Sequence, residues 1–248
     1  LGVGSAYSRT GGVYLTTLGG SILDSTDDDL KDIQSGLVVL SATGGGIGTA
    51  ANSLDLNVVA SGTLTATATG TISLRETEGD MNVDRVLSSG GDVHLWAHQS
   101  ILDAGDDPDA DVLGNSISLT AAMDGGIGGI GISGNDLDID SSYSAIGGLS
   151  AYSTGANIYL IEAQEVVNPG DGDLYLDEVG TTAVGAEDQP TAFIMAPGRI
   201  LNHRTDGGSN VASGKTRLFA GDDIGEESKS LQTAVGFIEG RSTDGSVW

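Results

Sequence analysis

Residues 12–24 read GVYLTTLGGSILD, and residues 91–103 read GDVHLWAHQSILD. Both segments end in the tetrapeptide Ser-Ile-Leu-Asp, at positions 21–24 and 100–103, a spacing of 79 residues. An acidic stretch follows each copy, STDDDLKDIQSG after the first and AGDDPDADVLGN after the second. Self-similarity at a long fixed spacing is typical of repeat architectures, so this repetition is the strongest indication of the fold.

The similarity continues beyond these segments. LVVLSATGGGIG at 37–48 corresponds to ISLTAAMDGGIG at 117–128, and NSLDLNV at 52–58 corresponds to NDLDIDS at 135–141. A weaker third copy begins GRILNHRTDGGSNVASG at 198–214 and lacks the acidic stretch of the other two. We therefore predict one repeat domain spanning 1–248, with super-repeats at roughly 11–90, 91–190 and 191–240.

Short segments with strand character recur within each copy, and Gly, Asn, Asp and Ser separate them. In Leu54-Asp55-Leu56 and in Leu137-Asp138-Ile139, apolar and acidic residues alternate, which predicts apolar side chains inside and acidic side chains in water. Strands this short bury enough surface only if successive coils stack on one another. We expect an all-β, right-handed parallel β-helix (a solenoid).

The repeat length also predicts the dimensions of the solenoid. A super-repeat of about 80 residues would hold four coils of about 20 residues, or about twelve coils in the chain. At about 4.8 Å per coil the rod would be roughly 58 Å long. A β-sandwich is the alternative, because its strands recur at a similar spacing.

The composition excludes several classes of protein. Asp and Glu number 35 against 10 Lys and Arg, a formal net charge of -25, which opposes binding to nucleic acid. The absence of Cys excludes disulfides and thiolate metal sites. No apolar run approaches the ~20 residues of a membrane span, and no signal peptide is visible. The chain begins with Leu1 rather than Met, as expected for a processed piece of a longer protein.

The run at 90–129, GGDVHLWAHQSILDAGDDPDADVLGNSISLTAAMDGGIGG, resembles the repeats of very large bacterial surface and secreted proteins. These are the filamentous-haemagglutinin-like, β-strand-repeat proteins. The shared elements are Ser-Ile-Leu-Asp with an acidic loop, an Ile-Ser-Leu-Thr-Ala strand, a Gly-Gly-Ile-Gly turn and a Leu-Asp-Ile strand. The resemblance covers most of residues 11–225, whereas 226–248 match nothing in the earlier copies. It implies an extracellular or cell-surface β-helical shaft without catalytic residues.

The acidic loops are the candidate metal sites, because alternate carboxylates in a tight loop can converge on calcium. The candidate ligands are Asp103, Asp106, Asp107, Asp109 and Asp111 in the second copy, and Asp24, Asp27, Asp28 and Asp29 in the first. The loop is not an EF-hand, because Val112 stands where that motif requires Gly and Ser118 where it requires Glu. A solvated acidic turn without metal remains the alternative.

These observations favour a structural function over an enzymatic one. We expect a stiff acidic rod, a segment of an extracellular bacterial surface or filament protein. Its open strand edges need cover, so we expect it to assemble end to end with copies of itself or with neighbouring repeats of one parent protein. An acidic middle and a tail richer in Arg and Lys from Arg199 onward would suit such a contact.

Two other functions stay open. The first is an adhesin-type module that binds a glycan or a host surface through outward Asp, Asn and Tyr side chains. The second is a β-helical carbohydrate-active enzyme, since paired carboxylates serve glycoside hydrolysis. No Lys or Arg lies between Arg85 and Arg199, which disfavours a lyase cleft in that region.

Overall fold

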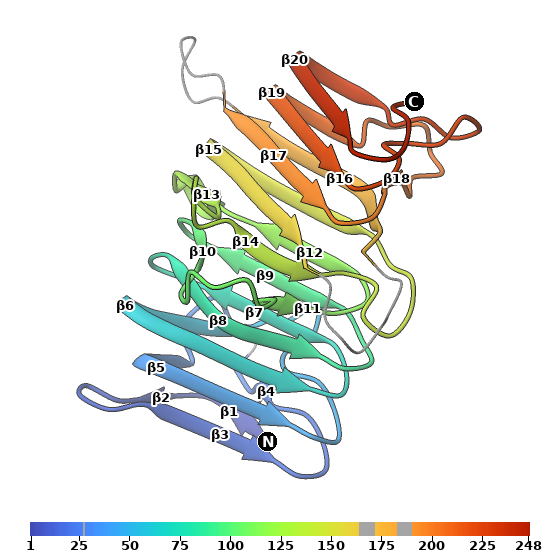
Figure 1. Ribbon diagram of the computed structural model, residues 1–248. Coiled ribbons are helices and arrows are strands. Elements are labelled where there is room, and N and C mark those ends of the chain that lie inside the picture. The colour runs from blue at the N-terminus through green and yellow to red at the C-terminus, as the bar shows by residue number, and fades with distance from the viewer. Residues whose placement is uncertain (27, 164–171, 183–189) are drawn as a thin grey trace.

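The computed structural model describes residues 1–26, 28–163, 172–182 and 190–248. Its strands are parallel and stack about 24 residues apart, so that the chain winds into a β-solenoid of about 9 turns (Figure 1). The predicted all-β parallel solenoid is thereby confirmed, and the β-sandwich alternative is wrong. Among the described residues, no helix is long and apolar enough to cross a membrane.

The strands range from 2 to 15 residues in length, and one sheet unites all of them except the first and fourth. In chain order the elements are β1 (Gly2–Val3), β2 (Ala6–Tyr7), β3 (Val13–Thr17), β4 (Leu23–Asp24), β5 (Ile33–Ala42), β6 (Leu54–Ala68), β7 (Ile72–Glu76), β8 (Met81–Ser88), β9 (Val93–Ala97), β10 (Ile101–Asp103), β11 (Val112–Leu113), β12 (Ile117–Thr120), the 3₁₀ turn η1 (Met123–Gly125), β13 (Gly128–Ile130), β14 (Leu137–Asp140), β15 (Leu149–Glu162), β16 (Leu174–Thr182), β17 (Thr191–Ala196), β18 (Ile200–Asn202), β19 (Val211–Ala220) and β20 (Thr233–Ser242).

The coils are longer than the sequence predicted. Ile22, Ile47, Ile72 and Val93 pair in one column, so these coils contain 25, 25 and 21 residues rather than about 20. About 9 turns replace the expected twelve, and at ~4.8 Å per coil the rod is about 43 Å long. The predicted number of coils was wrong because too few residues were assigned to the corners and loops that complete each coil.

The super-repeat does not contain a whole number of coils. A spacing of 79 residues at about 24 residues per coil is about 3.3 coils. Ile22 therefore stands in a column with Ile47, whereas its sequence equivalent Ile101 pairs with Met81 and Ile130 in a different column. The same unit consequently occupies a different position around the solenoid in each of the first two copies.

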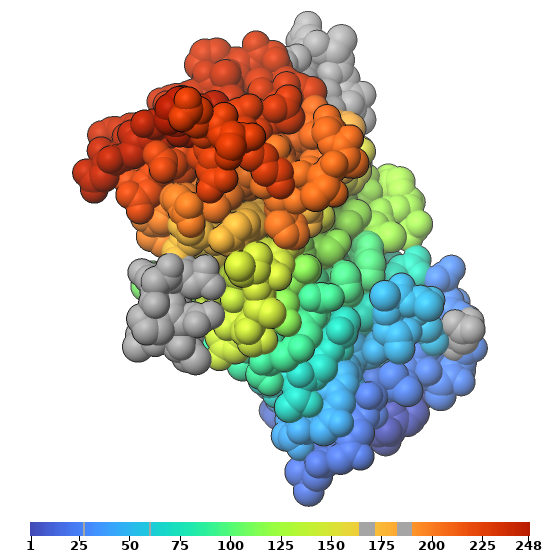
Figure 2. All heavy atoms as spheres, turned by 90° about the vertical axis from the view of Figure 1, so that its right-hand side faces the viewer, coloured from blue at the N-terminus to red at the C-terminus, as the bar shows by residue number. Residues whose placement is uncertain are grey.

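The interior is a continuous stack of aliphatic side chains. Ile22, Ile47 and Ile72 are 0% exposed, as are Leu54 and Leu74 on adjacent rungs. Every second residue of a strand points inward, so each coil adds one layer to a single core that extends along the solenoid. Figure 2 shows the resulting body, in which colours follow one another from the N-terminal to the C-terminal coil.

The last coil leaves this core partly open. Among the described residues, β20 pairs only with β19, so its outer edge has no strand partner. Ile238, Val247 and Trp248 are 47%, 56% and 47% exposed there. They border a cavity of ≈ 220 Å³ that reaches the buried Leu218 and Ile224. At the other end, β3 likewise pairs only with β5 in the described part of the chain.

Candidate functional site

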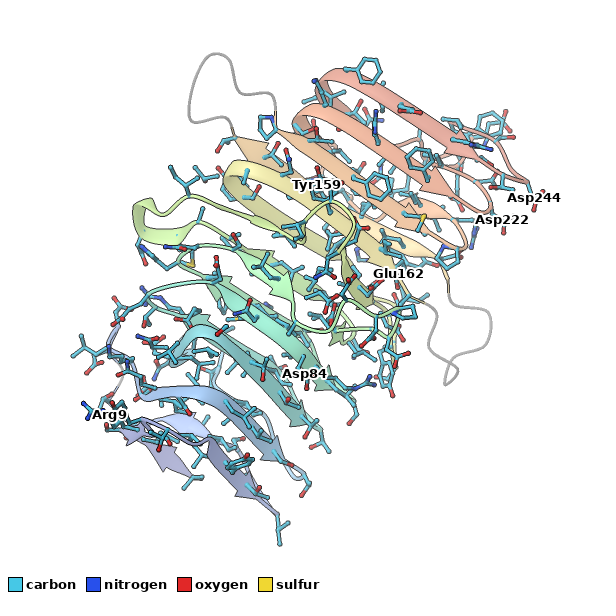
Figure 3. The ribbon with its side chains drawn as sticks, turned by 60° about the vertical axis from the view of Figure 1, so that its left-hand side comes forward. Arg9, Asp84, Tyr159, Glu162, Asp222 and Asp244 are labelled. Atoms are coloured by element: carbon cyan, nitrogen blue, oxygen red, sulfur yellow. The ribbon has the colours of Figure 1, made fainter. Side chains whose placement is uncertain are left out.

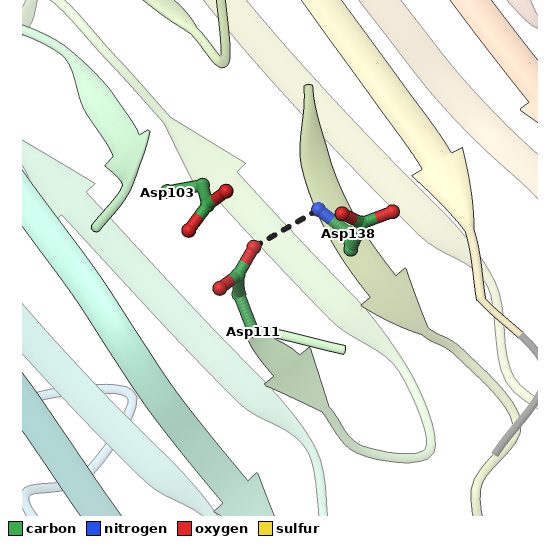
Figure 4. A group of neighbouring side chains, drawn as sticks. All are labelled: Asp103, Asp111 and Asp138. Carbon is green, nitrogen blue, oxygen red and sulfur yellow. Dashed lines mark hydrogen bonds between the residues drawn. The ribbon is translucent and has the colours of Figure 1, made fainter. Parts of the chain in front are cut away.

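Three carboxylates from separate segments meet beside β10, β11 and β14. Asp103, Asp111 and Asp138 each contribute an oxygen, and these oxygens all lie within 4.8 Å of one another (Figure 4). The three residues are 7%, 5% and 8% exposed. Asp103 ends β10, Asp111 precedes β11 and Asp138 lies within β14 on the next coil. We call these residues the second cluster.

Backbone groups hold the second cluster in place. The N–H of Asp138 donates to Asp111 Oδ2 at 3.0 Å, and the N–H of Asp111 donates to the Asp138 carbonyl at 2.8 Å. The N–H groups of Gly105 and Asp106 donate to the Asp103 carboxylate at 2.5 and 2.8 Å. The loop after β10 therefore folds back around its own first aspartate, and this fixes the carboxylates beside one another.

The electrostatics of the second cluster favour a positive partner. Burial, and then the charge of Asp103, raise the pKa of Asp111 to about 9. Burial and the charge of Asp103 raise the pKa of Asp138 to about 6. The charge of Asp138 further raises the pKa of Asp111. Either protons or a cation must therefore neutralise this group.

The first copy places Asp24, Asp32 and Asp55 at the equivalent positions with the same backbone hydrogen bonds, although these three carboxylates do not converge within 4.8 Å as those of the second cluster do; we call them the first cluster. Their exposed fractions are 9%, 2% and 2%. The N–H of Asp55 donates to Asp32 Oδ2 at 3.3 Å, the N–H of Asp32 donates to the Asp55 carbonyl at 2.9 Å, and Thr26 N–H donates to Asp24 Oδ1 at 2.7 Å. Asp32 Oδ1 is buried and has no hydrogen-bond partner.

One neighbour distinguishes the first cluster from the second. Arg75 pairs with Asp55 across the coils, whereas Ile161 occupies the corresponding position beside Asp138. Burial raises the pKa of Asp55 to about 7, and the positive charge of Arg75 opposes this rise. Arg75 also forms ion pairs with Asp29 and with Asp124. The first cluster thus has a cationic side chain nearby, and the second has an aliphatic one.

The structure buries some of the predicted metal ligands in the clusters and leaves the others exposed. Asp24, Asp103 and Asp111 enter the clusters, whereas Asp106, Asp107, Asp109, Asp28 and Asp29 are exposed. Asp27 lies outside the described residues.

Sequence reasoning missed Asp55 and Asp138, which were expected to face water because they alternate with core residues. They do point away from the core, but both are buried beside the other cluster residues. Their identical place in NSLDLNV and NDLDIDS is the signal that could have found them.

A second feature lies on the outer face of the C-terminal coils. All 3 phenylalanines of the chain, Phe193, Phe219 and Phe237, point outward from β17, β19 and β20 rather than into the core. The Phe193 ring centroid is 5.5 Å from that of Phe219 and 6.2 Å from that of Tyr159 on β15. Figure 3 labels Tyr159 on this face of the solenoid. Outward phenylalanines at adjacent rungs are unusual, because large apolar side chains stabilise the fold mainly when they are buried.

Positively charged side chains lie beside these rings. Lys215 pairs in register with Phe237, and Arg217 pairs with Phe193. Arg217 contacts Glu239 at 3.2 Å. Hollows of ≈ 670 and ≈ 680 Å³ lie on either side of Phe193, the first lined by Lys215 and Arg217 and the second by Arg241. We call this surface the aromatic face; it comprises Tyr159, Phe193, Phe219, Phe237, Lys215, Arg217 and Arg241.

The chain was compared with protein-family models, with curated proteins and with solved structures. None of the three comparisons found a match.

Proposed function

We propose that this chain is a structural segment of an extracellular bacterial surface or filament protein, of the filamentous-haemagglutinin-like kind. The supporting observation is the continuous core of about 9 stacked coils, which makes the solenoid a stiff rod. Acidic side chains on the outside keep such a rod soluble at a net charge of -25. The resemblance of its repeats to those of bacterial surface proteins supports an extracellular location.

In this proposal the rod continues end to end, because another coil would cover the edge of β20. That edge presents unpaired backbone groups, and Ile238, Val247 and Trp248 beside it are about half exposed. A further coil, from a second copy or from neighbouring repeats, would pair with the edge and bury these side chains.

Sedimentation velocity over a range of concentrations, with electron microscopy of the same samples, tests the assembly. The Ile238→Asp, Trp248→Asp variant should stay monomeric where the wild type forms linear assemblies. Ile146→Asp is the control, because Ile146 is 68% exposed but lies in the middle of the rod. A wild type that is monomeric at every concentration would exclude end-to-end assembly.

The proposal includes calcium as a stabilising ion and no catalytic activity. The carboxylates of both clusters are at least nine-tenths buried, so a polymeric substrate has no direct access to them. A screen of acidic and neutral polysaccharides for released sugars tests this part. Hydrolysis or elimination that disappears in Asp111→Asn would favour the carbohydrate-active enzyme instead.

A binding module of the adhesin type is the second candidate, and the aromatic face is the observation that favours it. Exposed rings stack on the apolar faces of sugars, and Lys215, Arg217 and Arg241 would attract carboxylate groups. An array of acidic and neutral glycans tests this function. Binding to acidic glycans should disappear in Phe193→Ser, Phe219→Ser and persist in Tyr14→Ser, because Tyr14 is exposed on β3 near the other end.

A further inference from the structure

The third copy contains a third cluster, in which amides replace carboxylates. Asn202 ends β18, Asn210 precedes β19, and Gln232 precedes β20. The N–H of Gln232 donates to Asn210 Oδ1 at 3.0 Å, and the N–H of Asn210 donates to the Gln232 carbonyl at 2.7 Å. These two bonds repeat the bonds between Asp55 and Asp32 in the first cluster. The three clusters therefore share one backbone arrangement, although the Gln232 side chain is exposed and donates to Ser230, whereas Asp55 and Asp138 are buried.

The third cluster is complete within the protein. Asn210 Nδ2 donates to Asn202 Oδ1 at 3.0 Å, and the N–H of Arg204 donates to the same oxygen at 2.9 Å. Asn210 is 0% exposed, and its amide supplies both a donor and an acceptor to its neighbours. An amide pair at these two positions therefore needs no ion.

The first two clusters lack that donor. In the first cluster, Asp24 and Asp32 occupy the positions of Asn202 and Asn210. In the second cluster, Asp103 and Asp111 occupy the same positions. An ionised carboxylate accepts hydrogen bonds but donates none. Asp32 is 2% exposed, yet its Oδ1 atom has no hydrogen-bond partner. Either a proton shared between the carboxyl groups or a cation must take the place that the Asn210 amide nitrogen fills in the third cluster, because buried carboxylates repel one another.

The chemistry of the available oxygens selects the type of cation. The second cluster offers three carboxylates within 4.8 Å. The half-buried Asn135 donates from Nδ2 to the Asp103 carbonyl at 3.2 Å, and its Oδ1 atom has no hydrogen-bond partner. Three buried carboxylates contributed by different segments suit calcium, which tolerates flexible coordination, whereas magnesium retains several waters in a regular octahedron.

We propose that the first and second clusters each bind one calcium-class divalent cation, and that the third cluster replaces the ion with the amide pair of Asn202 and Asn210. The second cluster binds more tightly, because Arg75 lies beside Asp55 of the first and repels a cation there. This inference rests on the calcium-binding part of the proposed function. It is independent of end-to-end assembly.

Isothermal titration with calcium chloride tests the inference on the whole chain. The wild type should bind two calcium ions with unequal affinities. Asp103→Asn, Asp111→Asn should remove the tighter site and Asp24→Asn, Asp32→Asn the weaker one. Both variants reproduce the Asn202 and Asn210 pair of the third cluster, so they introduce a pair that the chain already contains. Arg75→Met should tighten the weaker site and leave the other unchanged.

The converse variant adds a site. Asn202→Asp, Asn210→Asp, Gln232→Asp recreates the carboxylate cluster in the third copy and should raise the stoichiometry from two ions to three. Asp106→Asn, Asp109→Asn is the charge-matched control, because both residues are exposed in the same loop as the second cluster. Its titration should match that of the wild type.

Three results would overturn the inference. They are a wild-type stoichiometry below two, binding that survives the Asn replacements, and equal loss of binding in the control. Loss of assembly with an intact stoichiometry would refute only the end-to-end contact of the proposed function. Intact assembly without calcium binding would refute only the inference drawn here.

Discussion

Replacing Glu76 with Gln should abolish the pH dependence that this buried carboxyl imposes on stability. Glu76 ends β7 and is 1% exposed. Its Oε2 atom accepts the N–H of Val58 at 2.7 Å, and its Oε1 atom accepts the N–H of Glu78 at 3.3 Å. Burial outweighs these hydrogen bonds and raises the pKa of Glu76 from 4.5 to about 7.

The size of the effect follows from that shift. A change of roughly 2.5 pKa units corresponds to about 3 kcal/mol between the two protonation states. The folded state holds the proton more tightly than the unfolded state does. The stabilising contribution is therefore complete below pH 4.5 and is lost as the pH rises through about 7.

Gln cannot ionise, so the variant should not lose this stabilising contribution as the pH rises. Its amide offers one oxygen to two backbone N–H groups, which costs about 1 kcal/mol at every pH. Glu76→Gln should therefore be about 1 kcal/mol less stable than the wild type at pH 4.5 and about 2 kcal/mol more stable at pH 8.

Urea denaturation followed by circular dichroism, in EDTA at several pH values, measures the difference. Glu227→Gln is the control, because Glu227 is exposed near the C-terminal end, and its difference from the wild type should not vary with pH. A stability difference for Glu76→Gln that stays constant from pH 4.5 to 8 would show that Glu76 is ionised at no extra cost when folded.

Three further predictions concern the core, a tight turn and the bound ions. Ile72→Ala should cost ~2–5 kcal/mol in urea denaturation, because the residue is completely buried, whereas Ile146→Ala should cost under ~0.5 kcal/mol. Gly48 has φ +62 and an added Cβ would overlap the Ser73 carbonyl oxygen, so Gly48→Ala should cost at least ~2 kcal/mol; Gly79→Ala, with no atom within 4 Å of the added Cβ, should be neutral. Removing calcium with EDTA should lower the melting temperature measured by calorimetry, since a ligand at 100 times its Kd contributes ~2.7 kcal/mol per site; an unchanged melting temperature would contradict tight binding to the folded state.

The solenoid could be predicted from the sequence because repetition and strand alternation report local geometry. Leu54-Asp55-Leu56 shows which side chains point inward, and the structure agrees that the leucines form the core. The length of a coil could not be predicted in the same way. It depends on how many residues the corners take up, and strands of similar length are compatible with coils of 21 or 25 residues.

The clusters were only partly predictable, because their members come together through stacking. The spacing of Asp103 and Asp111 in one loop pointed to the right region. Asp138 joins them from the next coil, 27 residues beyond Asp111, and no local pattern reports that proximity. Likewise, Phe193 and Phe219 become neighbours only when β17 and β19 stack, so the aromatic face was invisible in the sequence.

The 79-residue repeat has a geometric consequence for anything that approaches the rod. Because it spans about 3.3 coils, the second copy is turned by about a third of a revolution relative to the first. Longer arrays with this repeat would distribute equivalent loops along a screw path, and three copies would face every direction. A neighbouring molecule that approaches such a fibre from any direction would then contact an equivalent loop.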